Sequence, residues 1–462
     1  MTTGIDAVVL GLAGKAIQVF ALEGCHLSFP LAPIGIRASR LRALVDDPMS
    51  PDGQSCHAEF SQLVNEVPTR ALWQPDGDRL WDIYGDVLAG AVLAQGSLTA
   101  AEESDYQRAY AALYTPNRGG VLGESLAVRA YEQCRDAYLA AAQEYNNRKG
   151  DADTTNDPHV TEQWTTDEAA LRERIAEAER DWTTTGHRCA VEDARRLLRE
   201  LGSRSPTTIW AGYRKLFDPE LPEIFFHTAP DGSGYLPTGY LPSDVVDTAW
   251  PVITVTHPQL AGLTAAAPPQ LRDRLSDVDG PAPIESVSFE YSAVKVTRSW
   301  LVPEAFGSRA WRFRDPTRVL SDGAPSPTGE CTAYVDGLVL ARTITVRHRA
   351  DAPPDLGFLP SGRPSHTVLK ARPYPKEAML ARVAARREAR NSVAAGPVTA
   401  IRHPLRTAPT RIPSRRAPVL RPRRPATPAP TVVTSDPDEV YVIAFQCRAL
   451  PRSPDPDPTL TW

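Results

Sequence analysis

The chain has 462 residues, of which 42% are apolar and 23% are charged, and its formal net charge is −5. A chain of this length is too long to fold around a single hydrophobic core, so we expect two or three domains. No apolar run reaches the roughly 18 residues of a membrane-spanning helix, and the N-terminus lacks the basic start of a secretory leader, so we expect a protein that is cytoplasmic at synthesis.

Six cysteines are spread along the chain without a Cys-x-x-Cys pair, which favours free thiols over a disulfide framework. A zinc site is the alternative, because cysteine and histidine are close in sequence at Cys25-His26, Cys56-His57 and His187-x-Cys189. Adjacent residues point in different directions on a helix or strand and therefore chelate one ion poorly. We predict no metal and no cofactor.

Residues 1–203 are predicted to form a helical bundle. Apolar residues between Ile5 and Phe20 recur near the helical period, and 79–94 is a second strong helix. A third helix is expected to begin at Thr99, with Glu102 placed for a capping box, and to stop before Thr115.

A long helical hairpin is predicted next. Apolar and aromatic residues follow a seven-residue beat over 125–145 and again over 164–182, and 191–201 prolongs the second arm. The polar stretch 146–158 predicts the loop between the two helices. The tyrosines and tryptophans of the stripe could stack on bases or sugars, but aromatic residues at helical spacing favour a bundle core.

Residues 204–282 form a proline-rich transition region, and a β domain is predicted over 283–369 plus 438–462. In its central strand, 287–296, the apolar residues first occupy odd positions and then also even ones, so they lie on both faces of the strand. This pattern predicts a β-bulge or burial on both faces. Two further strands are expected at 337–347 and 439–450. Four aromatic core anchors follow the central strand: Trp300, Phe306, Trp311 and Phe313.

The resulting fold class is α+β: a helical bundle with a long hairpin, followed by an antiparallel β-sandwich-like domain that is interrupted by a basic insertion at 370–437. Residues 370–424 contain fifteen Lys and Arg against two acids, a local charge of +13, which leaves −18 for the rest. A basic helix is predicted at 376–390 and a disordered Pro/Arg-rich stretch at 396–430.

The insertion is the candidate site for an anionic partner. Its attraction should weaken as salt rises. The partner could be an acidic protein surface, an anionic membrane surface or nucleic acid, and nucleic acid is least favoured because no aromatic residues interleave the distal stretch. A linker kept soluble by its charge is the alternative. The candidate binding residues are Arg386, Arg387, Arg415, Arg416, Arg421, Arg423 and Arg424.

The C-terminal tail alternates proline with Asp455 and Asp457 and ends at Trp462. Proline holds such a segment extended. The tail could dock on the basic insertion or on a partner, or it could fray into solvent.

Two short motifs resemble a family of large, poorly characterised bacterial proteins, some of them encoded near phage-tail-like contractile injection systems. One is Arg298-Ser299-Trp300, which is similar to that family's Arg-Pro-Trp signature with serine in place of proline; the other is the Pro-Asp-Pro tail. The resemblance covers 284–348 and 439–462. It implies structural signature residues at Arg298, Trp300, Trp311 and Trp462, and it carries no activity.

Motifs of common enzymes are incomplete. Gly11-Leu-Ala-Gly14-Lys15 is a fragment of a phosphate-binding loop, but Ala16 stands where a magnesium-binding hydroxyl is needed. A hydrolase with a site assembled in space, using His227 or His257, stays open.

We therefore expect a non-enzymatic structural or interaction protein that has a protein partner. The resemblance suggests that this protein is itself a component or cargo of a phage-tail-like contractile injection particle. The alternative is a membrane-active toxin in which the hairpin or the glycine-containing apolar helices rearrange into a bilayer. Dye release from liposomes would distinguish the two.

Overall fold

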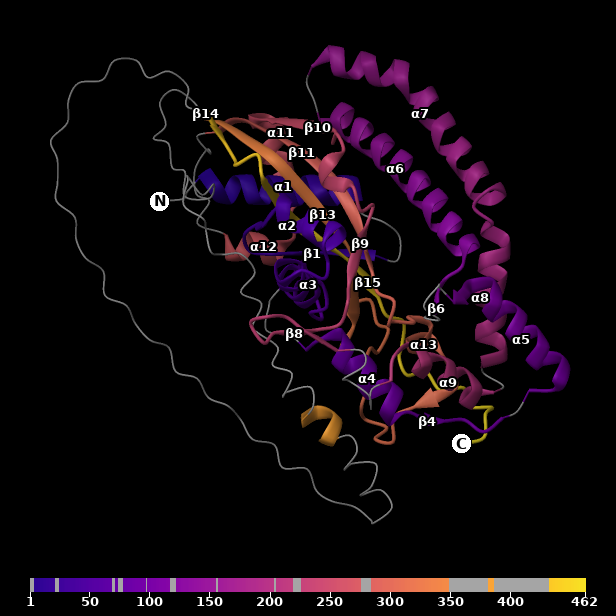
Figure 1. Ribbon diagram of the computed structural model, residues 1–462. Helices are drawn as coiled ribbons and strands as arrows, with labels where there is room; N and C mark the ends of the chain where they lie inside the picture. Colours follow the sequence, from indigo (N-terminus) through magenta and orange to yellow (C-terminus); the bar gives the residue numbers. More distant parts are fainter. Residues whose placement is uncertain are drawn as a thin grey trace, which may run out of the picture.

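The structure is a computed structural model. It describes residues 4–20, 25–68, 71–73, 78–96, 98–116, 122–154, 157–202, 205–218, 226–275, 284–348, 381–385 and 432–462. The α+β class is confirmed: a large, mostly antiparallel sheet is combined with many helices (Figure 1). None of the described helices is long and apolar enough to span a bilayer.

Three long strands form the centre of the sheet. β11 (Ile284–Thr297) pairs antiparallel with β13 (Ala333–His348), and β13 pairs in turn with β15 (Glu439–Ala449). The sheet runs in the order β10-β11-β13-β15-β1-β3. The outer strands are short: β10 (Val252–Thr256), β1 (Cys25–Phe29), β3 (Ala71–Leu72), β2 (Ile34–Arg37), β9 (Gly239–Leu241) and β14 (Val432–Thr434).

Strands from the two ends of the chain lie side by side in this sheet. Both β1 and β2 pair with β15, although about 400 residues separate them in sequence. Within the described residues helices, not a second large sheet, cover the sheet, so the sandwich arrangement is not found there. Residues 25–29, 34–37 and 71–72 were expected to be helical, but they form strands: β1 and β2 take their backbone hydrogen-bond partners from β15, and β3 takes its partners from β1.

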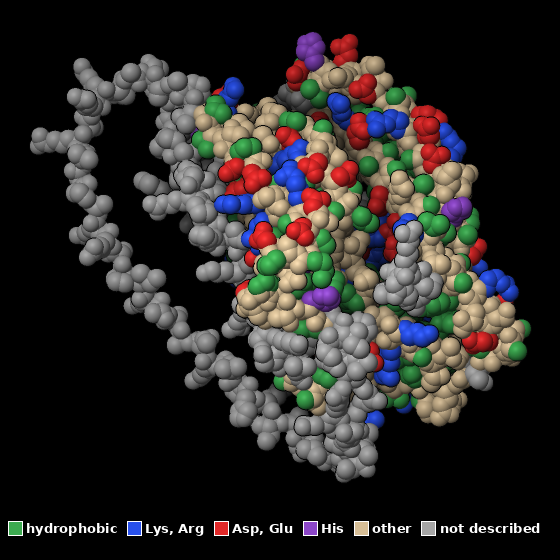
Figure 2. Space-filling model, in the orientation of Figure 1, with side chains coloured by type: hydrophobic (Ala, Val, Ile, Leu, Met, Phe, Trp, Pro, Cys, Tyr) green, Lys and Arg blue, Asp and Glu red, His purple; other side chains and the backbone are tan. Residues whose placement is uncertain are grey.

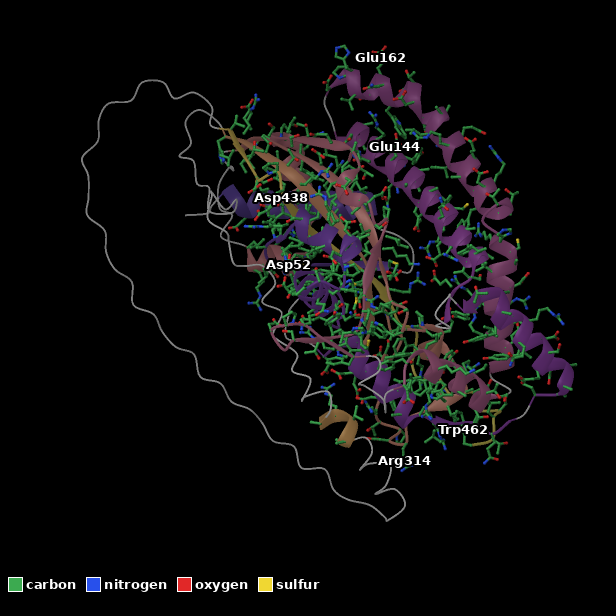
Figure 3. The ribbon with its side chains drawn as sticks, in the orientation of Figure 1. Asp52, Glu144, Glu162, Arg314, Asp438 and Trp462 are labelled. Carbon is green, nitrogen blue, oxygen red and sulfur yellow. The ribbon has the colours of Figure 1, made fainter. Side chains whose placement is uncertain are left out.

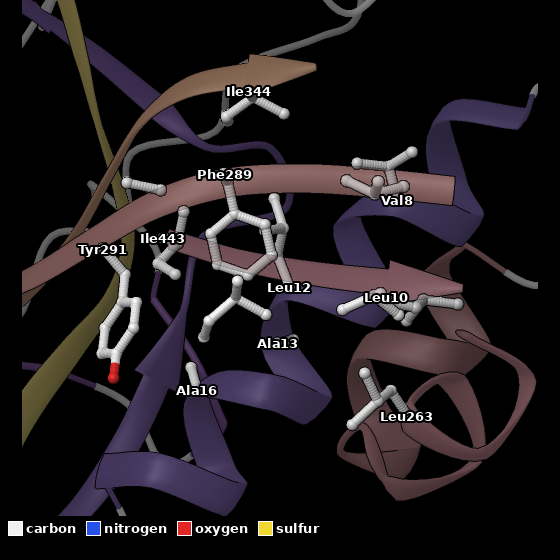
Figure 4. Close-up of a cluster of buried hydrophobic side chains, with 14 of the residues drawn as sticks. Val8, Leu10, Leu12, Ala13, Ala16, Leu263, Phe289, Tyr291, Ile344 and Ile443 are labelled. Carbon is white, nitrogen blue, oxygen red and sulfur yellow. The ribbon is translucent and has the colours of Figure 1, made fainter. Parts of the chain in front are cut away.

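One face of the sheet is covered by α1 (Gly4–Phe20) and α11 (His257–Ala266). Figure 4 shows Leu12, Ala13 and Ala16 of α1 beneath Phe289 and Tyr291 of β11. Nearly the whole surface of α1 is buried, and that explains why its sequence is apolar almost all round.

The other face is covered by α2 (Ala38–Asp46) and α3 (Pro51–Val64). Val294 and Val296 of β11 pack on this side, whereas Val287 and Phe289 pack on the first. The change of parity in the sequence is therefore explained by burial on both faces, with a register shift between Ser288 and Glu290.

The predicted aromatic anchors belong to a third core, below the end of the sheet. It joins α4 (Leu80–Gly90) and α9 (Pro206–Leu216) with Trp300, Phe306, Trp311 and Phe313. The remaining short elements are β4 (Val92–Leu93), β5 (Tyr114–Pro116), β6 (Leu122–Glu124), β7 (His227–Thr228), β8 (Gly234–Tyr235), η1 (Val245–Asp247), α12 (Pro269–Arg274), α13 (Glu304–Gly307) and β12 (Trp311–Arg312).

The helical hairpin is present and stands beside the sheet (Figure 1). It consists of α6 (Leu126–Thr154) and α7 (Pro158–Thr184), with α5 (Ala100–Leu113) and α8 (Arg188–Gly202) at its base. The predicted capping box between Thr99 and Glu102 is confirmed at the start of α5. The loop predicted at 146–158 is mostly wrong, because α6 continues to Thr154 and is held there by contacts with α1.

Candidate functional site

The seven arginines proposed to bind an anionic partner, Arg386, Arg387, Arg415, Arg416, Arg421, Arg423 and Arg424, lie outside the described residues. Of the basic helix predicted at 376–390, residues 381–385 are described and are helical. Val383 is buried there, and Arg382 forms ion pairs with Asp78 (3.2 Å) and Asp82 (3.1 Å) near the start of α4. This part of the segment therefore contacts the body of the protein.

Arg298 secures the C-terminal end of α3. Its Nε donates to Asn65 Oδ1 at 2.6 Å, and its Nη2 donates to the carbonyl of Val64 at 2.8 Å. The last carbonyls of a helix lack partners within the helix and attract positive charge. Burial lowers the pKa of Arg298 to about 10. The role of this signature arginine is thus to join the central strand to α3.

The two signature tryptophans are also internal. The indole of Trp300 donates to the carbonyl of Pro237 (3.1 Å), and that of Trp311 donates to the carbonyl of Ala305 (2.8 Å). Trp311 is 0% exposed. These side chains anchor the third core and present no surface to a partner.

The C-terminal tail docks on its own chain, at a place other than the basic insertion. Arg309 forms ion pairs with Asp455 (3.3 Å) and Asp457 (3.8 Å). The guanidinium of Arg312 lies 4.8 Å from the centroid of the Trp462 ring, a cation–π contact. Trp462 is accordingly held at the lower end of the molecule (Figure 3).

The aromatic stripe of the hairpin packs between its two helices, as the bundle-core interpretation predicted. Trp182 of α7 lies 5.4 Å from Tyr131 and 5.6 Å from Tyr138 of α6, between ring centroids. Nearer the tip, Tyr145 meets Trp164 edge-to-face at 5.2 Å. We call α6 and α7 together the arm.

The base of the arm is joined to the sheet by a buried cluster of charges. Glu132 of α6 contacts the ammonium group of Lys295, at the end of β11, and also pairs with Arg135 (3.4 Å) and Arg195 (3.5 Å). Burial lowers the pKa of Lys295, while Asp336 and Glu124 act in the opposite direction. A carboxylate with three cationic neighbours is stable in a buried place, since each charge has a partner.

The far half of the arm is fastened to α1. Lys15 is buried, and its ammonium group donates to Asp151 Oδ1 at 2.7 Å and to Gln18 Oε1 at 3.0 Å. Burial lowers the pKa of Lys15, and Asp151 opposes that shift. Gly150 of α6 faces Gln18 so closely that a Cβ there would lie 1.8 Å from its amide nitrogen. Two separate contacts thus fix the arm along the sheet.

The outer side of the arm is acidic. Residues 126–184 contain 13 Asp and Glu against 7 Lys and Arg, a net charge of −6. α7 packs on α6 and, near its end, on α8, and acidic side chains are visible at the tip and along the outer side, with Lys and Arg among them (Figure 2). Within the described part of the chain, four carboxylates of α7 form no ion pair: Glu162, Asp167, Glu177 and Asp181.

Sequence reasoning missed the charged residues that hold the arm, although a signal was present. Lys15 stands alone among apolar neighbours in α1, and Lys295 falls on the strand face that Phe289 and Tyr291 also occupy. A lone lysine in an apolar pattern indicates a buried ion pair. Its partners, Glu132 and Asp151, could not be identified because they lie in a different part of the sequence.

No group of three or more His, Cys, Asp or Glu side chains is placed to hold a metal ion among the described residues. The six cysteines are free thiols. His227 lies 5.6 Å from the ring of Tyr235, and His57 stacks on the same tyrosine at 6.1 Å. No family model, no curated protein and no solved structure matches the chain.

Proposed function

We propose that this chain is a non-enzymatic interaction protein whose arm binds a basic surface of a protein partner. The observation that carries the proposal is the set of four carboxylates on α7 that have no cationic partner within the described residues. Glu162 and Glu177 lie opposite the stripe that contacts α6, so they face outward. Unpaired charges of one sign attract a partner of the other and accelerate its association.

The way the arm is fastened supports this function. Because Glu132 and Asp151 attach α6 to the body near both of its ends, the outer helix is presented in a fixed position. A surface that is already ordered loses little conformational entropy when a partner binds. A free helical hairpin of this length would be less suitable.

The basic segment is proposed as a second interaction surface, for an anionic partner. Its charge of +13 over residues 370–424 supports this proposal. Replacing Arg415, Arg416, Arg421, Arg423 and Arg424 by glutamine should weaken binding to an anionic surface at low salt, and should change little at high salt. The resemblance at residues 284–348 and 439–462 suggests components of a phage-tail-like contractile injection particle as the first partners to look for.

The test is a pull-down of tagged protein from its own host at low and at high salt. One variant removes the four unpaired charges of α7 through Glu162→Gln, Asp167→Asn, Glu177→Gln and Asp181→Asn. A matched control removes four exposed charges from the body through Asp46→Asn, Asp47→Asn, Asp52→Asn and Asp244→Asn.

We expect the arm variant to lose most of the partner that the native chain recovers at low salt, and the control to retain it. Equal recovery by the two variants would exclude the arm as the binding surface. Recovery of injection-particle proteins in both salt conditions would identify the partner. Circular dichroism before the pull-down confirms that both variants are folded.

A further inference from the structure

A short helical turn of the basic segment, residues 381–385, is docked on the body of the protein near the start of α4. Arg382 forms ion pairs with Asp78 at 3.2 Å and with Asp82 at 3.1 Å. Val383 is only 4% exposed, whereas the residues on both sides of it are exposed. One charged and one apolar side chain therefore hold this turn in place. We call residues 381–385 the docked turn.

The charge of Arg382 balances a buried acid at the start of α4. Three ionisable side chains are almost fully buried there: Glu66, Arg79 and Asp82. Glu66 and Arg79 form an ion pair with each other, so Asp82 is the acid in excess among the three, and Arg382 brings a positive charge to it. A buried charge is costly unless a charge of opposite sign accompanies it. Departure of the docked turn would remove this ion pair from Asp82, and the docked state is therefore favoured.

The docked turn is adjacent in sequence to arginines that are proposed to bind an anionic partner. Arg386 and Arg387 follow shortly after Arg382. The acids that hold Arg382 carry the same sign of charge as an anionic partner, so the partner and the body compete for positive charge at this end of the segment. Such competition weakens the apparent affinity in proportion to the fraction of molecules in which the segment is free.

We propose that the docked turn is an autoinhibitory latch, which restrains the basic segment until an anionic partner displaces Arg382 from Asp78 and Asp82. This inference rests on the proposed binding of an anionic partner by the basic segment. The affinity for the partner is then set by two quantities, the attraction of the arginines and the stability of the docked turn. The carboxylate of Asp78 is exposed and that of Asp82 is buried, so high salt weakens the latch only in part.

The first test opens the latch without changing any charge. Val383→Ser removes the buried apolar side chain, and Ala384→Ser, at an exposed position of the same turn, is the matched control. Trypsin cleaves after Arg382 when this residue leaves its ion pairs, so the rate of cleavage there, followed by mass spectrometry, reports the open fraction. We expect cleavage of Val383→Ser to be at least about tenfold faster than that of the native chain, and Ala384→Ser to keep the native rate. Equal rates in all three proteins would overturn the latch.

The second test measures binding of the full chain to fluorescently labelled poly-L-glutamate at low salt, by fluorescence anisotropy. We expect Val383→Ser to bind at least about threefold more tightly than the native chain and Ala384→Ser, because the segment is free in a larger fraction of the molecules. The variant in which the five arginines between residues 415 and 424 are replaced by glutamine should lose binding with the latch closed or open, since these charges supply most of the attraction.

The two measurements separate the latch from the function on which it rests. Faster cleavage of Val383→Ser together with unchanged affinity for poly-L-glutamate would overturn the autoinhibition and leave the docked turn as a structural contact. Absence of binding by both the native chain and Val383→Ser would overturn the proposed function of the basic segment and the autoinhibition with it. The rates of cleavage decide in either case whether the docked turn opens when Val383 is replaced.

Discussion

At Gly14, the absence of a side chain determines how closely α1 approaches α11. A Cβ at this position would lie 2.1 Å from the carbonyl oxygen of Leu263, a backbone atom that cannot move aside as a side chain can. A Cβ at Gly11, one turn earlier, would lie 2.3 Å from the side chain of Leu260. The two glycines that resemble part of a phosphate-binding loop therefore serve helix packing.

Replacement of Gly14 by alanine should destabilise the protein. We expect Gly14→Ala to lower the free energy of unfolding by about 3 kcal/mol, because α1 and α11 must separate to admit the methyl group. Urea denaturation measures the change. Gly262→Ala on α11 is the control, since nothing lies within 4 Å of its added Cβ. That variant should be neutral or more stable by up to about 1 kcal/mol, through helix propensity. Equal effects at both positions would contradict the packing argument.

The stability of the protein should depend on the protonation of His57. Burial lowers the pKa of His57 from its ordinary value of 6.5, so the unfolded chain takes up a proton more readily than the folded one. The contribution of neutral His57 to the free energy of unfolding is therefore fully present above pH 6.5. It is lost as the pH falls from there through the lower pKa of the folded state.

The measurement is the free energy of unfolding between pH 8 and pH 5, for the native chain and for His57→Gln. The native chain should lose stability below pH 6.5, and the variant should lose less over the same window. His159→Gln, which alters an exposed histidine at the start of α7, is the control and should retain the native slope. Identical slopes for all three proteins would rule out His57.

Among the elements, the arm depends on the contact between Glu132 and Lys295. Loss of Glu132 leaves the Lys295 ammonium group buried without its ion-pair partner, which costs about 3 kcal/mol, whereas loss of Lys295 leaves Glu132 with Arg135 and Arg195. We expect Glu132→Gln to destabilise the protein by about 3 kcal/mol and Lys295→Met by less, and the double variant by clearly less than the sum of the two.

The native chain, the two single variants and the double variant form a double-mutant cycle. Chemical denaturation of these four proteins gives the coupling energy between Glu132 and Lys295, and hydrogen exchange shows which elements lose protection. Protection in α6 and α7 should fall in the single variants while β11 stays protected. Additive effects of the two substitutions would show that the contact does not join the arm to the sheet. Arg172→Met, at an exposed pair with Glu168, is the control and should cost little.

The elements themselves could largely be predicted from sequence, because their signals are local. The parity of β11, the capping box at Thr99 and the aromatic stripe of the arm each lie within one short stretch of chain. The length of α6 could not be predicted, since its last turns have a polar composition typical of a loop. Their helical state depends on Lys15 and Gln18, more than a hundred residues away.

At the scale of the whole molecule, the tail closes the lower end of the fold. Ser453 is 0% exposed; its hydroxyl donates to the carbonyl of Phe306 at 2.6 Å, and its own carbonyl accepts from Leu320 N at 2.7 Å. Beyond it, the ion pairs of Arg309 and the ring of Trp462 lie closer to solvent. The contribution of the tail should therefore fall off toward its end.

Two truncations test this gradient. Removal of residues 455–462 should lower the thermal midpoint slightly, because only contacts of partly or fully exposed residues are lost. Removal of residues 452–462 should lower it much more, because buried hydrogen bonds at Ser453 are lost as well. The midpoints are compared by calorimetry, with Trp462→Ala as the smallest change. A shorter truncation as damaging as the longer one would contradict the gradient.

The order of the strands in the sheet could not be predicted from the sequence, for a related reason. Nothing near Cys25 or Ile34 indicates pairing with residues 439–448, since strand pairing is decided by contacts across the whole chain.

The chain leaves the sheet after β13 and comes back through β14, which pairs with the very end of β13: Arg347 lies opposite Val432, and Thr345 opposite Thr434. The end of β13 and the strand β14 are thus held next to each other, and β15 follows β14 in the chain. The entropic cost of holding two chain ends together rises by only about 0.6 kcal/mol for each doubling of a flexible chain between them. A guest such as a fluorescent domain or an affinity tag, inserted between residues 405 and 406, should therefore leave the sheet intact, which makes this position an entry point for labelling the protein in living cells.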